Sequence, residues 1–167
     1  MTRILGLDVG DRRIGVAVAD RDGGRAMPLT TLRRGSEAAG DGAALRALLD
    51  EQRAVEVVIG LPLHANGDEG DQARATRAWV DSVAAIIDVP VTFHDERLTS
   101  HLAEQRVGPM KRGRSGGPPT RTQREAYRAR IDREAAAIIL QDELDARAAA
   151  ASAPAELPSE HTTETTR

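Results

Sequence analysis

Three acidic residues lie in settings that are unfavourable for a charged side chain, and they are the first candidates for chemistry. Asp8 lies inside the apolar run from Ile4 to Val9, and Glu96 follows a predicted strand at its C-terminal end, where sites of α/β proteins gather. Asp132 lies beside an alanine-rich apolar stripe of a predicted helix. A carboxylate in such surroundings is costly unless it is paired or binds a cation.

If these acids converge in the fold, they form a set of hard oxygen ligands without histidine or cysteine. Such a set selects Mg²⁺ or Mn²⁺ over zinc. Two such ions about 4 Å apart would support in-line displacement at a phosphodiester, one activating water and the other stabilising the leaving oxygen. Spacing alone leaves ordinary alternatives open: Glu96 could pair with Arg97, Asp132 with Arg128, and Asp8 could cap the turn after its strand.

Other reactive motifs are absent from the sequence. His64, His94 and His101 are scattered without metal-ligand spacing, and His94, at a predicted strand end, is better explained as structural than as a proton carrier. No nucleophile elbow, P-loop or dinucleotide fingerprint occurs. The chain therefore offers carboxylate chemistry or none.

Basic residues are concentrated in one stretch of a chain whose net charge is −3. From Arg106 to Arg133 there are nine lysines and arginines against two acids, which indicates a polyanionic partner or a solvated basic face. Residues 108–123 are also rich in glycine and proline and are expected to form a flexible basic contact loop. With one Phe, one Trp and one Tyr, recognition by base stacking is disfavoured.

The elements that must position these residues follow from hydrophobic periodicity and turn signals. The predicted strands are 4–9, 14–19, 25–32, 55–61 and 89–94, and the predicted helices are 41–53, 71–87, 99–107 and 125–147. We expect Asp41 to cap the first helix, Pro28 to confine its strand to an edge, and Trp79 to lie in the core. Gly6 and Gly10 could let a metal or phosphate approach Asp8.

This order, β-β-β-α-β-α-β-α-α, predicts an α/β fold in which three antiparallel strands are extended by parallel strands and flanked by helices. Residues 1–147 are expected to form one domain, and 148–167, which have almost nothing to bury, a disordered tail. The absence of cysteine, of a signal peptide and of a membrane-length apolar run predicts a cytoplasmic protein without membrane contact.

Four motifs, in this order, resemble those of the YqgF/RuvX family. They are Gly6-Leu7-Asp8-Val9-Gly10 with Arg13-Ile14-Gly15-Val16-Ala17, then Ile59-Gly60-Leu61-Pro62-Leu63 with Asn66-Gly67, then Asp95-Glu96-Arg97-Leu98-Thr99-Ser100, and finally Ile131-Asp132 with Ala135-Ala136 and Ile138-Ile139-Leu140-Gln141. Each motif is weak alone, but four in sequence are specific, and together they span Ile4 to about Leu144.

The resemblance implies a ribonuclease H-like fold and a nuclease that acts in 5′-end processing of pre-16S rRNA or resolves Holliday junctions. It also implies that Asp8, Glu96 and Asp132 are the catalytic acids and the metal ligands. Members of this superfamily often bring a fourth acid one turn from the helix aspartate. Here those positions are alanines, Ala129, Ala135 and Ala136, so a second metal would be held weakly or mainly by substrate phosphate.

The favoured hypothesis is a metal-dependent endonuclease whose basic side chains contact phosphates and give affinity without sequence information. The candidate contacts are Arg12, Arg13, Arg97, Lys111, Arg112, Arg114, Arg121 and Arg124. Precursor rRNA is favoured over branched DNA as substrate. Junction cutting needs two symmetric incisions and predicts a homodimer, whereas trimming of rRNA is compatible with a monomer.

Two other classes of function remain open. A nucleotide-binding module of the actin and sugar-kinase type also begins with a Gly-x-Asp-x-Gly hairpin, but it needs a second domain for which this chain has no room. A non-catalytic RNA-binding factor of ribosome assembly agrees with the basic stretch and with the missing fourth acid. An Asp8→Asn variant separates this RNA-binding role from the endonuclease, because RNA binding should persist in the variant while cleavage, if the chain has it, should disappear.

Overall fold

The computed structural model describes residues 1–96, 99–110 and 117–152, and the element order is the predicted one. The strands are β1 (Arg3–Val9), β2 (Arg13–Asp20), β3 (Met27–Arg33), β4 (Ala54–Leu61) and β5 (Val91–Asp95). The helices are α1 (Ala38–Gln52), α2 (Asp71–Ile87), α3 (Thr99–Val107) and α4 (Arg121–Ser152).

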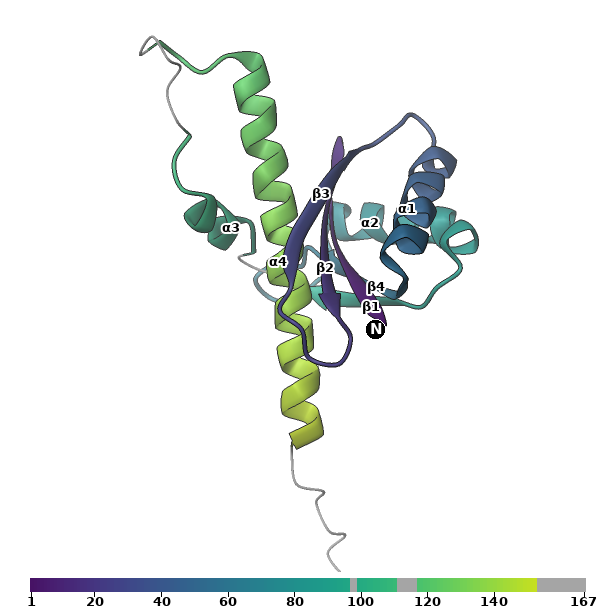
Figure 1. Cartoon of the computed structure of the whole chain (residues 1–167). Coiled ribbons are helices and arrows are strands. Elements are labelled where there is room, and N and C mark those ends of the chain that lie inside the picture. The colour runs from purple at the N-terminus through teal and green to yellow at the C-terminus, as the bar shows by residue number, and fades with distance from the viewer. Residues whose placement is uncertain (97–98, 111–116, 153–167) are drawn as a thin grey trace, which may run out of the picture.

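The five strands form one mixed sheet in the order β3-β2-β1-β4-β5. β1, β2 and β3 pair antiparallel, while β1–β4 and β4–β5 pair parallel, which confirms the predicted topology. The strand that contains Pro28 is at the edge, as expected, because proline has no N–H to donate to a neighbouring strand. Figure 1 shows the sheet between α1 and α2 on one side and α3 and α4 on the other.

The two faces of the sheet have different compositions because side chains alternate along each strand. The face toward α1 and α2 holds most of the large apolar strand residues, and these pack with the two helices into the main core. Its members include Leu5, Leu7, Val9, Ile14, Val16, Leu45, Leu49, Val57, Ile59, Trp79, Val80, Val83 and Ile87. The predicted core position of Trp79 is therefore confirmed.

The opposite face, on which α4 lies directly, carries glycines and alanines beside Ile4 and Val58. A methyl group on Gly15 would lie 2.0 Å from the Asp132 carbonyl oxygen, and one on Gly6 would lie 2.6 Å from the Leu140 Cβ. The expectation that Gly6 leaves room for a metal or phosphate is therefore wrong, since α4 fills that space. Glycine is needed here so that the helix backbone can approach the sheet.

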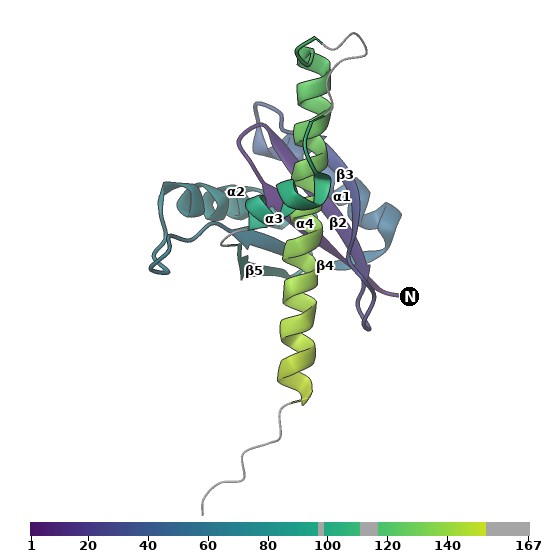
Figure 2. The same cartoon turned by 90° about the vertical axis from the view of Figure 1, so that its left-hand side faces the viewer.

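Helix α4 is longer than the periodicity predicts, with 32 residues instead of the span 125–147. Residues 121–123 were expected in the loop and 148–152 in the tail, but both are helical because Ala- and Arg-rich sequence continues a helix readily. Figures 1 and 2 show α4 extending past the sheet at both ends. Residues 111–116 of the predicted loop and 153–167 of the predicted tail lie outside the described residues.

Asp41 of α1 has a different role from the one that the sequence predicts. The cap prediction for Asp41 is wrong: α1 begins after Glu37, and Asp41 lies inside its first turn, 4% exposed. Its carboxylate accepts hydrogen bonds from Trp79 Nε1 at 3.1 Å, from the Gly35 amide at 2.9 Å and from Arg34 Nε at 3.2 Å.

Across the described part of the chain, no helix has the length and hydrophobicity that a membrane crossing requires.

Substitution of Gly15 tests the close approach of α4. In Gly15→Ala the new methyl would overlap the Asp132 carbonyl, so the free energy of unfolding should fall by about 3 kcal/mol or more. Gly40→Ala in α1 is the control, because a methyl there meets no atom within 4 Å and should stabilise by up to about 1 kcal/mol. Urea denaturation followed by circular dichroism measures both, and wild-type stability of Gly15→Ala would contradict the packing described.

Candidate active site

Asp8 is positioned by the β1–β2 hairpin directly beneath α4. It is the penultimate residue of β1, it alternates with Gly6 on the face toward α4, and it pairs in register with Gly15 of β2. Because the Gly15 backbone touches the Asp132 backbone, the hairpin places Asp8 next to the start of the buried segment of α4. Asp8 and Asp132, 124 residues apart in sequence, thus come together through Gly15.

Glu96 reaches the same place from the other side of β1. Its amide donates to the Leu61 carbonyl oxygen at 3.3 Å, which extends the β4–β5 pairing by one residue. A methyl on Gly60 would lie 2.1 Å from Glu96 Oε2, so the carboxylate lies over the end of β4. Since β4 is the parallel neighbour of β1, this position is adjacent to Asp8.

The electrostatics of these two acids show that their charges interact. Burial, then repulsion from Asp132, raises the pKa of Asp8 to about 7, against the opposing effect of Arg13. Burial, then repulsion from Asp8 and Asp95, raises the pKa of Glu96 to about 8. Neither carboxylate forms a hydrogen bond or ion pair with any described residue. Asp8 therefore lies between the other two predicted acids, and the charge of the cluster is not fully compensated.

Asp132 differs from the other two because its carboxylate has a cationic partner. Arg13 Nε donates to Asp132 Oδ2 at 2.5 Å, with 26% and 20% of the two side chains exposed. The alternative considered from sequence, a pair with Arg128, is not formed. With Asp132 turned toward Arg13, no three acidic or histidine side chains in the described ranges are arranged to ligate one ion.

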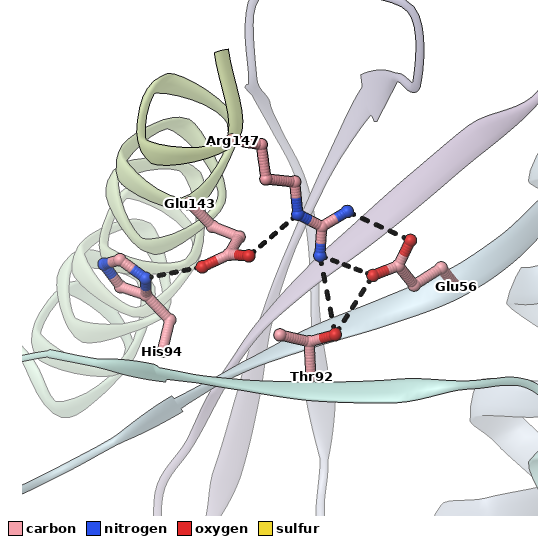
Figure 3. Close-up of polar contacts among 5 residues, drawn as sticks. All are labelled: Glu56, Thr92, His94, Glu143 and Arg147. Atoms are coloured by element: carbon pink, nitrogen blue, oxygen red, sulfur yellow. Dashed lines mark hydrogen bonds and ion pairs between the residues drawn. The ribbon is translucent and has the colours of Figure 1, made fainter. Parts of the chain in front are cut away.

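Glu56 shows that an acid in an apolar strand is not by itself a reactive group. It lies on β4, 9% exposed, and sequence reasoning did not single it out. Arg147 of α4 forms two hydrogen bonds to it, at 2.5 and 3.1 Å, and Thr92 donates a third at 3.1 Å (Figure 3). These donors, the Arg147 bonds above all, hold the pKa of Glu56 below its usual range despite partial burial, which is the opposite of Asp8.

The same network ties β5 to α4. Arg147 Nε also donates to Glu143 at 2.8 Å, and the other Glu143 oxygen is 2.9 Å from His94 Nδ1 (Figure 3). Although burial opposes it, hydrogen bonding to Arg147 and His94 keeps the pKa of Glu143 low. His94 is two residues before Glu96, so this arrangement positions the end of β5 relative to the helix that carries Asp132. His94 therefore has the structural role that the sequence predicts, as a partner of Glu143.

The turn between β1 and β2 is held from the opposite side of the sheet. Arg34 Nη1 donates to the Gly10 carbonyl at 2.9 Å, and the Arg34 amide donates to the Arg12 carbonyl at 3.0 Å. The Arg34 guanidinium is itself fixed by Asp41 and lies over the Trp79 ring, 5.7 Å from its centroid. Through these contacts α1 and α2 restrain the segment that joins Asp8 to Arg13. The pairing of Arg34 with Asp41 was not apparent from their spacing in the sequence.

The structure places some of the predicted basic contacts together and separates others. Arg12, Arg13 and Arg121 line one cleft of about 610 Å³, and sequence reasoning missed three further arginines there, Arg33, Arg34 and Arg128. Arg124 is not part of the lining, and its guanidinium donates to the Pro119 carbonyl at 2.5 Å. The predicted contacts Arg97, Lys111, Arg112 and Arg114 lie outside the described residues.

Comparison with known proteins identifies the family to which this chain is similar. A family model described as RuvX, Holliday junction resolvase, matches residues 2–146. A Chloroflexus aggregans protein with the provisional name pre-16S rRNA nuclease is 44% identical over 144 residues, covering 86% of this chain and 94% of the relative. A Synechococcus elongatus protein of the same name is 43% identical over 141 residues, covering 84% and 87%.

Among solved structures, RuvC of T. thermophilus in complex with Holliday junction substrate matches with a TM-score of 0.51 at 14% identity. The match covers 89% of this chain and 97% of RuvC. At this identity it bears on the fold alone, and it agrees with the predicted ribonuclease H-like architecture. The family resemblance seen in the four sequence motifs is confirmed by the family model and the curated relatives.

The uncompensated charge at Asp8 predicts that Asp8→Asn stabilises the metal-free protein in a pH-dependent way. The pKa of Asp8 is about 7 in the folded chain against an ordinary value of 3.8 for an aspartate, so stability is lost as the pH rises through this interval. Asparagine does not ionise, so the gain in stability should be about 2–3 kcal/mol larger near pH 8.5 than near pH 5. Urea denaturation in the presence of a chelator measures it.

Asp41→Asn is the matched control, since Asp41 is buried with three donors. Asparagine cannot accept all of them, so this variant should lose about 1–3 kcal/mol at both pH values. Destabilisation of Asp8→Asn at the higher pH would contradict the electrostatics of the cluster.

Proposed function

The chain belongs to the RuvX family, and from this premise we propose that it is a metal-dependent endonuclease with Asp8, Glu96 and Asp132 as catalytic acids. The observation that carries the proposal is the contrast among the acids on the α4 face. Glu56 is paired with an arginine and keeps a low pKa, whereas Asp8 and Glu96 repel each other and have raised pKa values. Such a pair favours a bound cation.

The donor set fits a hard divalent cation, Mg²⁺ or Mn²⁺. Asp8 and Glu96 supply carboxylate oxygens that no described base neutralises, and Asp132 would join them by exchanging Arg13 for the ion. The metal would supply a polarised water and stabilise the charge that develops on the phosphate. Arg13, released in that exchange, would face the substrate as a phosphate contact.

We infer that the substrate is the precursor of 16S rRNA, because the relatives are named as pre-16S rRNA nucleases. Cleavage at its 5′ end is the finer expectation from the family resemblance. Such an enzyme would work in the cytoplasm, where ribosomes assemble, and could do so as a monomer. The second candidate is a four-way DNA junction, favoured by the description of the family model. Resolution of a junction would require a homodimer with two symmetric sites.

Cleavage assays decide between the substrates and test for catalysis itself. The full chain with Mg²⁺ or Mn²⁺ should cut pre-16S rRNA in preference to a four-way DNA junction. Asp8→Asn and Glu96→Gln should reduce cleavage to background while leaving RNA binding intact, because they remove ligands and not the fold. Binding without cleavage of either substrate by the wild-type chain would instead support a non-catalytic role in ribosome assembly.

Metal binding is tested independently of activity by thermal unfolding. A hundredfold excess of Mn²⁺ over its dissociation constant should raise the melting temperature of the wild-type chain by about 5–10 °C. The shift should vanish in Asp8→Asn and Glu96→Gln. Glu56→Gln is the matched control: it lowers the melting temperature by breaking the pair with Arg147 but should keep the Mn²⁺-induced shift.

A further inference from the structure

A cleft beside the acidic cluster is built mainly from arginines of three separate elements. Arg12 and Arg13 come from the β1–β2 turn and the start of β2, Arg33 from the end of β3, and Arg121 and Arg128 from the first turns of α4. Arg34, which follows β3, also lines it, together with the acids Asp11 and Glu125. The cleft is about 610 Å³ and open.

Part of this positive charge is not compensated within the described part of the molecule. Arg12 and Arg128 form no side-chain hydrogen bond or ion pair with any described residue. Arg33 has only a 4.0 Å contact with Glu125 and is 85% exposed, and Arg121 is 87% exposed while sharing the same glutamate. Exposed pairs of this kind contribute little to stability. One glutamate therefore serves two arginines, and the remaining charge faces solvent.

The pairing of β2 with β3 strengthens this argument. Arg13 and Arg33 are direct partners in the antiparallel register, so two like charges lie opposite each other on one face of the sheet. Such a cross-strand pair is unfavourable for folding. Arg13 is relieved by Asp132, whereas Arg33 has no strong partner among the described residues. Binding of a polyanion would offset the repulsion between these two arginines, which explains why a pair that opposes stability is present.

The position and lining of the cleft indicate which polyanion it fits. Arg13 both lines the cleft and pairs with Asp132, so the cleft adjoins the acidic cluster. The α4 segment from Arg121 to Asp132 is about 16 Å long at the ordinary helical rise, enough for several successive phosphates. No aromatic side chain is among the lining residues, so base stacking is not available there.

We propose that this arginine cleft holds the sugar-phosphate backbone of the substrate strand on one side of the scissile bond, with Arg33 and Arg128 as phosphate contacts. The inference rests on the proposed nuclease function and adds to it a defined path for the strand. Arginine suits this role because its guanidinium donates two parallel hydrogen bonds to phosphate. Recognition in the cleft is by charge and is independent of base sequence.

The test measures how the affinity for nucleic acid depends on salt, in an Asp8→Asn background so that no cleavage occurs. Dissociation constants for pre-16S rRNA and for a DNA duplex are determined over a range of KCl concentrations. Arg33→Gln and Arg128→Gln should each weaken binding about tenfold near 0.1 M salt and reduce the slope of log affinity against log salt by about one. The double variant should reduce the slope by about two.

Arg130→Gln is the matched control, since Arg130 is exposed on the same helix, carries the same charge and lies outside the cleft lining. It should leave the slope unchanged, and two RNA sequences of equal length should respond alike to Arg128→Gln. Equal effects of Arg128→Gln and Arg130→Gln, or no effect of either cleft variant, would overturn the proposal. A slope effect confined to binding of an acidic protein partner would do so as well.

Failure of this inference is distinguishable from failure of the nuclease proposal. If the wild-type chain cleaves RNA but the cleft variants bind with unchanged slopes, the nuclease stands and the strand takes another path. If the cleft variants lose slope but the wild-type chain cleaves nothing, the cleft binds nucleic acid and the catalytic assignment fails. Circular dichroism should show wild-type folding for Arg128→Gln, because this exposed side chain has no described partner to lose.

Discussion

The contact between α4 and the glycines of β1 and β2 is the constraint on which the rest of the structure depends. Gly6 and Gly15 leave no gap between the sheet and the helix backbone, so α4 crosses the sheet at the level of Asp8. Any larger residue would move the helix and with it Asp132. Most of the large apolar strand residues lie on the opposite face, where α1 and α2 form the main core.

Around this contact, the acids divide into two groups according to their partners. Glu56, Glu143 and Asp41 are satisfied by arginine, histidine, indole or amide donors, and they fasten α4, β5 and the β1–β2 turn in place. Asp8 and Glu96 lack such donors among the described residues and repel each other. The hydrogen-bonded acids hold in place the elements that bring Asp8 and Glu96 close to each other. Such an arrangement is typical of a functional site, where stability is lost in favour of activity.

The basic residues are organised by the same helix. The first turns of α4 bring Arg121 and Arg128 opposite the β2–β3 edge, and the ion pair between Arg13 and Asp132 joins the resulting cleft to the acidic cluster. Negative and positive regions thus adjoin along one face of the molecule. A cation and a phosphate backbone can each find the complementary charge there without the protein changing its fold.

The sequence by itself determined the order of the elements, the edge position of Pro28, the buried Trp79 and the three suspect acids, because hydrophobic period and turn residues are local signals. It did not reveal that Gly6 faces α4, that Asp41 binds Arg34, or that Glu56 is neutralised by Arg147, 91 residues away. Only the tertiary structure decided these points, since whether a buried acid is satisfied depends on donors that are distant in the chain and adjacent in space.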